Sequence, residues 1–418
     1  MEKYQLYNDD CLVVLKNMKN DGVMVDSVVC DPPYHLTSIV SRFKNTSIDD
    51  DNSTGEKSKN RDNALSRLSR GFMGQTWDGG DLAFDPATWK LVYDVMKPGA
   101  HLLTFGGTRT FHRMICAIED AGFEIRDCLM WMYGTGFPKS HNLDGNFEGW
   151  GTALKPAWEP IVFARKPFNG TVANNMAMYG TGAINVDKCR IEINPEIDDP
   201  RLGGKGSWKT DKAAKMVYEG GYKGDNISSS NLGRWPANVI HDGSDEVEDA
   251  FAEFGERKSG SLSAEQQSKG GWSHHAAYGA GSERGGTNEY VGSTGSASRF
   301  FYSAKASAKD RVYTCKICDE SLFKSEFKNH KHNEENFNHI TSHPTCKPIS
   351  LMKYLVKLVT PTNGLVLDPF SGSGTTLQAA VEEGFSCIGI EKELGYYKNI
   401  EYRMKNTNIP SATKTLFD

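Results

Sequence analysis

The chain has 418 residues, of which 38% are hydrophobic and 24% charged, a composition typical of a globular protein with long polar loops. The first ten residues, MEKYQLYNDD, are too polar for a secretory signal, and no apolar run reaches the roughly 18 residues that span a bilayer, so no membrane association is expected. The formal net charge of −5 excludes nucleic-acid binding driven by overall charge and leaves only a local basic surface for that purpose.

Apolar periodicity predicts alternating strands and helices in the first third of the chain. Strands are expected at residues 4–7, 26–30, 101–105 and 123–133, and helices at 11–18, 85–96 and 109–121. Strands separated by helices at this rhythm predict a doubly wound, mostly parallel α/β sheet. Residues 38–74 are rich in polar and charged side chains and are expected to form a surface loop.

The periodicity weakens from residue 166 to residue 299, where glycine, serine and asparagine are frequent. Only residues 235–240 and 246–254 keep a regular pattern, so we expect an irregular insertion here. The α/β pattern then returns. Helices are expected at residues 349–359, 375–383 and 394–404, and strands at 365–367 and 387–390, before a polar tail.

A carboxylate and an aromatic ring directly follow the strand expected at residues 26–30. The motif is Asp31-Pro32-Pro33-Tyr34, and it lies at the carboxyl edge of the sheet, where open α/β sheets bind ligands. To methylate an amino group, an enzyme must accept its N–H hydrogens and so orient the nitrogen. The Asp31 carboxylate and the Pro32 carbonyl can do this, while Tyr34 can stack on a flipped base. The alternative is an ordinary turn, which Asp-Pro and Pro-Pro also favour.

A glycine-rich turn, DPFSGSGTT at residues 368–376, lies between an expected strand and an expected helix. Its glycines allow a ligand to approach the backbone closely. It lacks the lysine of a phosphate loop and the third glycine of a dinucleotide fingerprint. Glu391 ends the next expected strand, and an acid roughly 20 residues after the first strand can bind ribose hydroxyls. The turn therefore predicts an adenosine-like cofactor without a pyrophosphate.

Together the two motifs resemble those of the amino-group DNA methyltransferases, which modify adenine N6 or cytosine N4. Asp31–Tyr34 looks like the catalytic motif in the form typical of adenine enzymes, and residues 368–374 look like the S-adenosylmethionine loop. The catalytic motif comes first, as in the family's beta class. The resemblance covers roughly residues 4–165 and 300–404. It implies transfer of a methyl group from S-adenosylmethionine to adenine N6 in double-stranded DNA, with cytosine N4 as the alternative.

The resemblance also implies roles for single residues. Asp10, in the stretch NDDCL at residues 8–12, would hold the adenine of the cofactor, although Asp9 stands where the family usually has glycine. Lys347, in HPTCKP at residues 343–348, would lie near its methionine end. The implied cofactor-binding set is Asp10, Lys347, Asp368, Pro369, Phe370, Gly372, Gly374, Thr375 and Glu391, and the implied catalytic set is Asp31, Pro32, Pro33 and Tyr34.

On this interpretation one α/β domain is assembled from both ends of the chain. We expect its catalytic half at residues 1–165, a target-recognition region at 166–299, a return to the domain at 300–312, a zinc-binding insertion at 313–342, the cofactor half at 343–405 and a tail at 406–418. The segments at residues 131–140 and 158–160 are candidate walls of the base pocket, with strand-end packing as the alternative. Candidate phosphate contacts, or simply solvated charges, are Lys44, Lys57, Lys59, Arg61, Arg67 and Arg70.

Two cysteines with metal-ligand spacing, Cys315 and Cys318, precede His330 and His332. A pair of thiolates two residues apart is half of a tetrahedral zinc site, and the histidines offer the remainder. The gap between the histidines is shorter than the usual three to five residues, so His339 is the alternative to His332. The segment is short and charged, and unliganded side chains are the other interpretation. Any zinc here would have a structural role, since the family does not require it.

Several alternatives stay open at this point. The chain could be a zinc-containing DNA-binding protein with an inactive methyltransferase fold. An enzyme that methylates a protein or RNA amide would more often carry Asn at position 31, and a nicotinamide oxidoreductase would carry the missing glycine. The odd number of cysteines, several in apolar runs, favours the cytoplasm, in a bacterium or a phage-infected cell. The recognised DNA sequence, a homodimer and a cognate restriction nuclease are not decided by the sequence.

Overall fold

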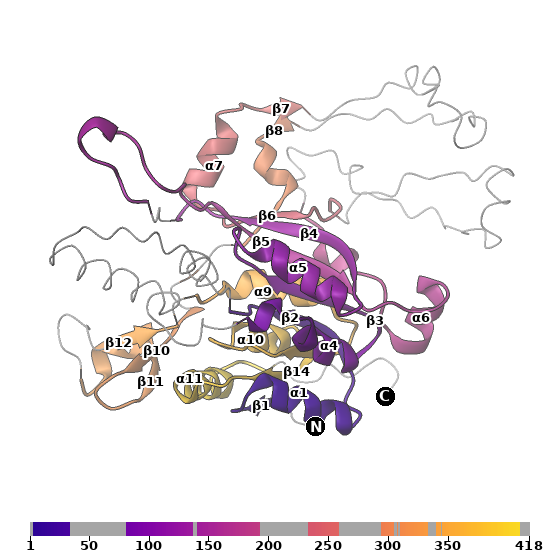
Figure 1. Cartoon of the computed structure of the whole chain (residues 1–418). Helices are drawn as coiled ribbons and strands as arrows, with labels where there is room; N and C mark the ends of the chain where they lie inside the picture. Colours follow the sequence, from indigo (N-terminus) through magenta and orange to yellow (C-terminus); the bar gives the residue numbers. More distant parts are fainter. Residues whose placement is uncertain are drawn as a thin grey trace, which may run out of the picture. The chain divides into compact units, whose positions relative to one another are not determined.

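The structure is a computed structural model (Figure 1). It describes residues 3–33, 81–136, 140–192, 233–258, 294–304, 307, 310–332, 340–343 and 345–409. The chain forms two compact units. The first comprises Met1–Asn185, Asn238–Asp242 and Ala304–Asp418, and the second comprises Val186–Ala237 and Gly243–Ser303. Among the described residues, no helix has both the length and the apolar character needed to cross a membrane.

The first unit is built on a sheet whose strands follow the order β1-β14-β13-β2-β3-β5-β4-β6. The strands are β1 (Tyr4–Tyr7), β2 (Val25–Cys30), β3 (Met96–Phe105), β4 (Glu124–Met132), β5 (Trp158–Arg165), β6 (Val239–His241), β13 (Leu365–Asp368) and β14 (Ser386–Ile390). Neighbours from β1 to β3 are parallel, and β6 is parallel to β4. Only β5 runs antiparallel to both of its neighbours. The mostly parallel α/β sheet expected from the sequence is confirmed.

Two groups of helices cover the two faces of this sheet (Figure 1). In one group α4 packs against α1 and α5, and in the other α10 packs against α9 and α11. Successive side chains of a strand point to opposite faces of the sheet. Val28 and Cys30 of β2 therefore belong to the core shared with the first group. Ser27 points to the other face, where its hydroxyl forms a hydrogen bond of 2.8 Å with that of Thr360, which follows α9. The helices are α1 (Cys11–Asn20), α4 (Pro86–Asp94), α5 (Phe111–Asp120), α6 (Val172–Tyr179), α9 (Ile349–Val359), α10 (Thr375–Glu382) and α11 (Leu394–Lys405).

Local sequence and contacts with distant residues together determine where helix α4 begins and ends. Asp85 caps its first turn by accepting a hydrogen bond from the Ala87 N–H at 2.9 Å, and Pro86 suits its first position. The helix ends at Asp94, two residues earlier than predicted, because β3 already begins at Met96. The Lys166 ammonium donates to the carbonyls of Tyr93 and Met96 at 2.8 and 2.7 Å. A distant lysine thus satisfies carbonyls that a helix end leaves open.

Periodicity alone did not reveal two elements of the first unit, β5 and α6. Residues 160–164 of β5 are all apolar, and the strand lies between β3 and β4, with both faces covered. Its sequence therefore lacks the alternation of apolar and polar residues that marks a half-exposed strand. The shorter elements of this unit are η3 (Leu82–Phe84), η4 (Gly145–Phe147), β10 (Val312–Cys315), β11 (Ser321–Phe323), η10 (Lys324–Asn329) and β12 (Ile340–Ser342). Strands β11, β10 and β12 form a separate antiparallel sheet.

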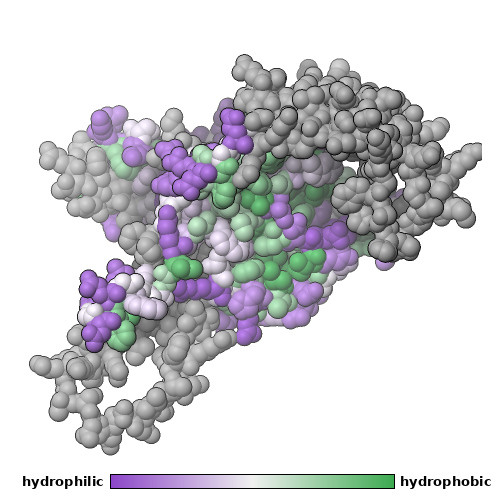
Figure 2. Space-filling view, turned by 90° about the horizontal axis from the view of Figure 1, so that it is seen from above, coloured by the Kyte–Doolittle hydropathy of each residue, from purple (hydrophilic) through white to green (hydrophobic). Residues whose placement is uncertain are grey.

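The second unit consists of short elements. They are η5 (Asp187–Cys189), α7 (Asp245–Ala252), β7 (Arg257–Lys258), β8 (Thr294–Gly295), η8 (Ala297–Phe300) and β9 (Tyr302–Ser303). Strands β7 and β8 pair with each other, and the ring of Phe251 packs on that of Phe301 at 5.7 Å. Figure 2 shows that the described surface carries both hydrophilic and hydrophobic residues.

Candidate active site

A cavity of about 820 Å³ lies at the carboxyl ends of β2, β13 and β14. These parallel strands end at one edge of the sheet, which is where ligands bind in open α/β folds. The predicted site residues that line it are Asp10, Asp31, Pro32, Pro33, Lys347, Asp368, Pro369, Phe370, Gly372, Thr375 and Glu391. Gly374 is not among the lining residues, and Tyr34 lies outside the described part of the chain.

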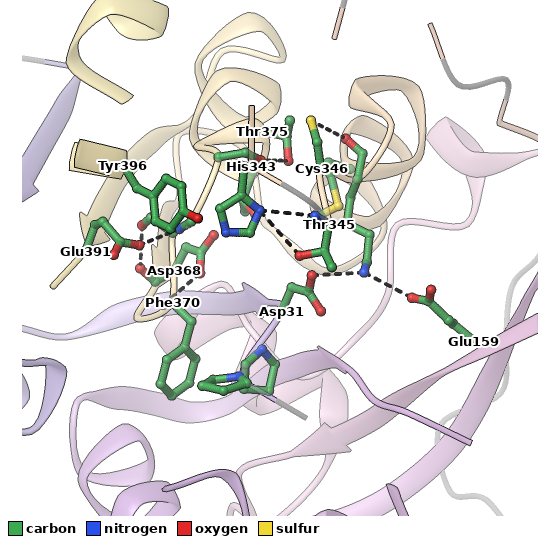
Figure 3. Close-up of a pocket in the computed structure, with 18 of the residues that line it drawn as sticks. Asp31, Glu159, His343, Thr345, Cys346, Asp368, Phe370, Thr375, Glu391 and Tyr396 are labelled. Atoms are coloured by element: carbon green, nitrogen blue, oxygen red, sulfur yellow. Dashed lines mark hydrogen bonds and ion pairs between the residues drawn. The ribbon is translucent and has the colours of Figure 1, made fainter. Parts of the chain in front are cut away.

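Asp31 is held at the end of β2 by a buried lysine. The Lys347 ammonium lies 2.9 Å from Asp31 Oδ2 and 3.0 Å from Glu159 Oε2, and Figure 3 draws both ion pairs. It also lies 4.8 Å from the centre of the Phe105 ring. Burial opposes the positive charge, but the two carboxylates outweigh it and raise the pKa of Lys347. The ammonium therefore stays charged and orients the Asp31 carboxylate.

Two further acids stand at the ends of β13 and β14. Burial raises the pKa of Asp368 to about 7, and the nearby charges of Asp31 and Glu391 act in the same direction. The Asp368 side chain nevertheless accepts a hydrogen bond from the Phe370 N–H at 3.1 Å. A carboxylate in this position is costly for the ligand-free protein, so its charge favours a ligand that brings hydrogen-bond donors or positive charge.

Glu391 is similar. Burial raises its pKa to about 7, although its carboxylate accepts hydrogen bonds from the N–H groups of Gly372 and Glu393, both at 2.8 Å. The first of these bonds ties the end of β14 to the glycine-rich turn after β13. Glu391 and the turn therefore line the same cavity, as Figure 3 shows.

The turn itself needs glycine at two positions. Gly372 has φ +49°, and a Cβ added there would lie 3.2 Å from His343 Nε2. Gly374, at φ +74°, is the residue from which α10 begins. Burial lowers the pKa of His343 to about 4, so its ring is neutral, and it packs on the Tyr396 ring at 4.5 Å. Tyr396, on α11, was not among the predicted site residues, because no local motif marks it.

Asp10 caps α1 rather than pointing only into the cavity. One carboxylate oxygen accepts a hydrogen bond from the Leu12 N–H at 2.9 Å, and the other pairs with the Lys392 ammonium at 3.0 Å. Partial burial works against the charge, but Lys392 and the Leu12 N–H lower the pKa of Asp10. Asp10 thus forms a charged rim of the cavity beside the loop that follows β14.

Aromatic side chains line the part of the cavity that is formed by the ends of β4 and β5. The segments proposed as pocket walls do line it, through Trp131, Tyr133, Trp158 and Glu159. Sequence reasoning missed Asp242, which accepts a hydrogen bond from the Gly134 N–H at 3.2 Å and so holds the loop after β4. Nothing local marks this residue, because it follows a strand of only three residues in a region of weak periodicity.

A comparison with protein families gives an independent result. The family model that matches is described as DNA methylase, of the N6 and N4 type, and it matches residues 25–402. The match spans Asp31, the glycine-rich turn and Glu391. The chain belongs to the N6/N4 DNA methylase family.

The chain is also similar to individual proteins of known sequence or structure. Type II methyltransferase M.HindIII of Haemophilus influenzae is 21% identical over 415 residues, covering 94% of this chain and 92% of the relative. DNA adenine methyltransferase YhdJ of Escherichia coli is 42% identical over 57 residues, 14% of this chain and 19% of the relative. Among solved structures, the M1.HpyAVI complex with S-adenosylmethionine aligns with a TM-score of 0.39 at 14% identity, covering 96% of this chain and 99% of that one.

The other candidate residues of the DNA methylase lie elsewhere. The four predicted metal ligands, Cys315, Cys318, His330 and His332, come together outside the cavity, while His339 lies outside the described residues. The basic residues proposed as phosphate contacts, between positions 44 and 70, also fall outside the described part of the chain.

Proposed function

We propose that this DNA methylase transfers a methyl group from S-adenosylmethionine to the N6 amino group of adenine in double-stranded DNA. One observation carries the proposal. A single cavity holds an ion-paired carboxylate at the end of β2 together with a glycine-rich turn and two buried acids at the ends of β13 and β14. An acceptor for an amino group and a site for a nucleoside thus lie side by side.

The residues present fit S-adenosylmethionine. Gly372 adopts φ +49°, and a Cβ there would press on the neutral imidazole of His343 at 3.2 Å, so glycine keeps the backbone of the turn accessible to a ligand. Asp368 and Glu391 would accept hydrogen bonds from its hydroxyl or ammonium groups, and Asp10 would lie at its rim. When bound, this cofactor supplies the electrophilic methyl group.

Asp31 and Pro32 would hold the target nitrogen. A base flipped out of the duplex presents two N–H groups, which the Asp31 carboxylate and the Pro32 carbonyl accept, while Tyr34 supports the base by stacking. The charge of Asp31 stabilises the positive character that develops on the nitrogen as it donates its electron pair. Lys347 fixes the orientation of the carboxylate. Burial raises the pKa of Cys30, next to the site, so this thiol is a poor nucleophile, and direct transfer without a covalent enzyme intermediate is favoured.

We assign target recognition to the insertion at residues 166–299, because the catalytic residues alone carry no information about DNA sequence. The similarity to a type II methyltransferase supports a role in DNA modification in a bacterial cytoplasm, beside a cognate restriction nuclease. Adenine is preferred to cytosine because Asp31-Pro32-Pro33-Tyr34 has the form typical of adenine enzymes.

Nucleoside analysis of DNA treated with the protein and a labelled methyl donor tests the proposal. We expect N6-methyladenine with the native chain. Asp31→Ala should lower the rate by at least about 100-fold, because a group that stabilises developing charge is lost, while donor binding measured by calorimetry persists. Glu119→Ala, on the exposed face of α5, is the matched control and should keep full activity.

Other outcomes are equally clear. If the product is N4-methylcytosine, the target base is cytosine and the proposed mechanism is unchanged. Donor binding without any modified base would indicate an inactive fold that only binds DNA. Transfer at the native rate by Asp31→Ala would contradict the role given to this carboxylate.

A further inference from the structure

Four metal-ligand side chains meet in the small sheet formed by β11, β10 and β12. Cys315 ends β10, Cys318 lies in the turn to β11, and His330 and His332 follow η10. One ligand atom from each lies within 4.8 Å of the other three. We infer that these four side chains bind one structural zinc ion, a site that the proposed function neither requires nor explains.

The distances suit a tetrahedral ion. With Zn–S of about 2.3 Å and Zn–N of about 2.05 Å, a tetrahedral angle places a sulfur and a nitrogen ligand about 3.6 Å apart. Cys315 Sγ lies 3.7 Å from His332 Nδ1, and Cys318 Sγ lies 3.4 Å from His330 Nε2. Both values are within about 0.2 Å of the expected separation. Two thiolates and two imidazoles in this geometry favour zinc over magnesium or calcium, which prefer oxygen ligands.

The surroundings also suit a metal ligand. His330 turns Nε2 toward Cys318, and its other nitrogen, Nδ1, lies 3.7 Å from a carboxylate oxygen of Glu320. A carboxylate behind a ligating histidine is the usual way to orient the ring and fix which nitrogen binds the metal. Lys331 holds the same carboxylate through an ion pair of 2.7 Å.

The turn between the cysteines brings the two thiols to the same point. Asp319 has φ +58°, and its N–H donates to the Cys315 carbonyl at 2.8 Å, while the Cys315 N–H donates to the Glu320 carbonyl at 3.0 Å. This closes a tight loop around Cys318. Aspartate is among the residues that tolerate positive φ, so these hydrogen bonds hold the loop in a shape that keeps both thiols on one side.

The small sheet has little apolar core of its own. Among its described residues only Val312, Cys315 and Leu322 are buried apolar side chains. So small a core cannot stabilise an independent fold, and a metal commonly serves instead. The zinc would therefore supply much of the free energy that keeps this segment folded.

The segment is connected to the cofactor side of the fold through α11, which lies beside it in Figure 1. Asn399 exchanges hydrogen bonds with Thr314 and accepts one from Ser321 at 2.6 Å. One turn further, Arg403 donates to the carbonyls of Ser373, in the glycine-rich turn, and of Asp310, both at 2.7 Å. The zinc segment thus braces the helix that holds the turn, without touching the cavity.

Metal analysis of the purified full-length protein tests the site. After desalting, mass spectrometry should find about one zinc per chain, and cobalt substitution should give the absorption bands of a tetrahedral thiolate site. Cys318→Ser should lose most of the zinc. Cys116→Ser removes an exposed thiol on α5 and serves as the matched control, so it should retain the native zinc content.

A strong chelator should lower the unfolding midpoint of the native chain and of Cys116→Ser, and leave that of Cys318→Ser unchanged. One result would contradict the proposed zinc site. If the native protein, refolded with excess zinc, holds no more metal than Cys318→Ser, the four side chains are only hydrogen-bonded to one another. The zinc content of the refolded native protein can be measured whether or not Cys318→Ser folds, and it is independent of methyl transfer.

Discussion

The buried acid at the end of β13 allows a quantitative prediction about stability. Asp368 is 2% exposed, and burial raises its pKa from 3.8 to about 7. Since each pKa unit corresponds to about 1.36 kcal/mol, keeping this carboxyl ionised at pH 8 costs the folded ligand-free protein on the order of 4 kcal/mol. Because the pKa of Asp368 is higher in the folded protein, the neutral carboxyl contributes fully to stability below pH 3.8. This contribution is lost as the pH rises through about 7, where the carboxyl ionises.

Asp368→Asn should remove this cost, because the amide has the same shape and can still accept the hydrogen bond from the Phe370 N–H. We expect the variant to be more stable than the native chain by up to about 4 kcal/mol at pH 8, and by less than about 2 kcal/mol at pH 5. For a protein of this size that corresponds to a rise in melting temperature of roughly 4–6 °C at pH 8.

The same substitution should weaken the binding of S-adenosylmethionine at least about tenfold, because an anionic acceptor is lost. Thermal unfolding at the two pH values and calorimetric titration measure both effects. Asp94→Asn is a control of opposite sign. Although burial opposes it, hydrogen bonds from Lys19 and Lys90 lower the pKa of Asp94, so its loss should destabilise the protein. Equal melting temperatures for Asp368→Asn and the native chain at pH 8 would show that the buried Asp368 carboxylate does not destabilise the protein.

Two further substitutions test the cavity. Gly372→Ala should weaken the binding of S-adenosylmethionine, because a Cβ at φ +49° is strained and would press on His343 at 3.2 Å. Gly395→Ala adds the same methyl group in open space on α11 and should bind normally. Equal affinities in calorimetry would remove the turn from the site. Lys347→Met leaves the carboxylates of Asp31 and Glu159 without their shared cation and should cost about 3–5 kcal/mol in thermal unfolding, with loss of methyl transfer. A Lys347→Met protein with native melting temperature and activity would rule out this role.

The parts of the site that were predictable from sequence are those fixed by strand ends. Asp31 and the glycine-rich turn each follow an apolar run directly, and the carboxyl ends of parallel strands share one edge. Their meeting in one cavity therefore needed no knowledge of the rest of the chain. The same holds for the cysteine and histidine spacing, which brought four ligand atoms together.

The parts that were not predictable depend on contacts between distant segments. Lys347 was expected near the cofactor, but the structure places its ammonium between Asp31 and Glu159, which no local pattern reveals. The sequence does not predict β5, because a short apolar run has no periodicity. Its antiparallel direction depends on how the chain returns across the sheet. Asp242 reaches the cavity only because β6 joins the sheet beside β4.

The order of strands has a consequence for how the protein is made on the ribosome. β1 and β2 precede the other strands of the sheet in sequence, yet they are not neighbours in it, since β14 and β13 lie between them. β2 can pair with β3 soon after both are synthesised, whereas β13 and β14, which connect β2 to β1, follow more than 300 residues later, so the gap between β1 and β2 stays open until then. The glycine-rich turn and Glu391 arrive with those same late strands. The site for the methyl donor can therefore form only after residue 391 has been synthesised.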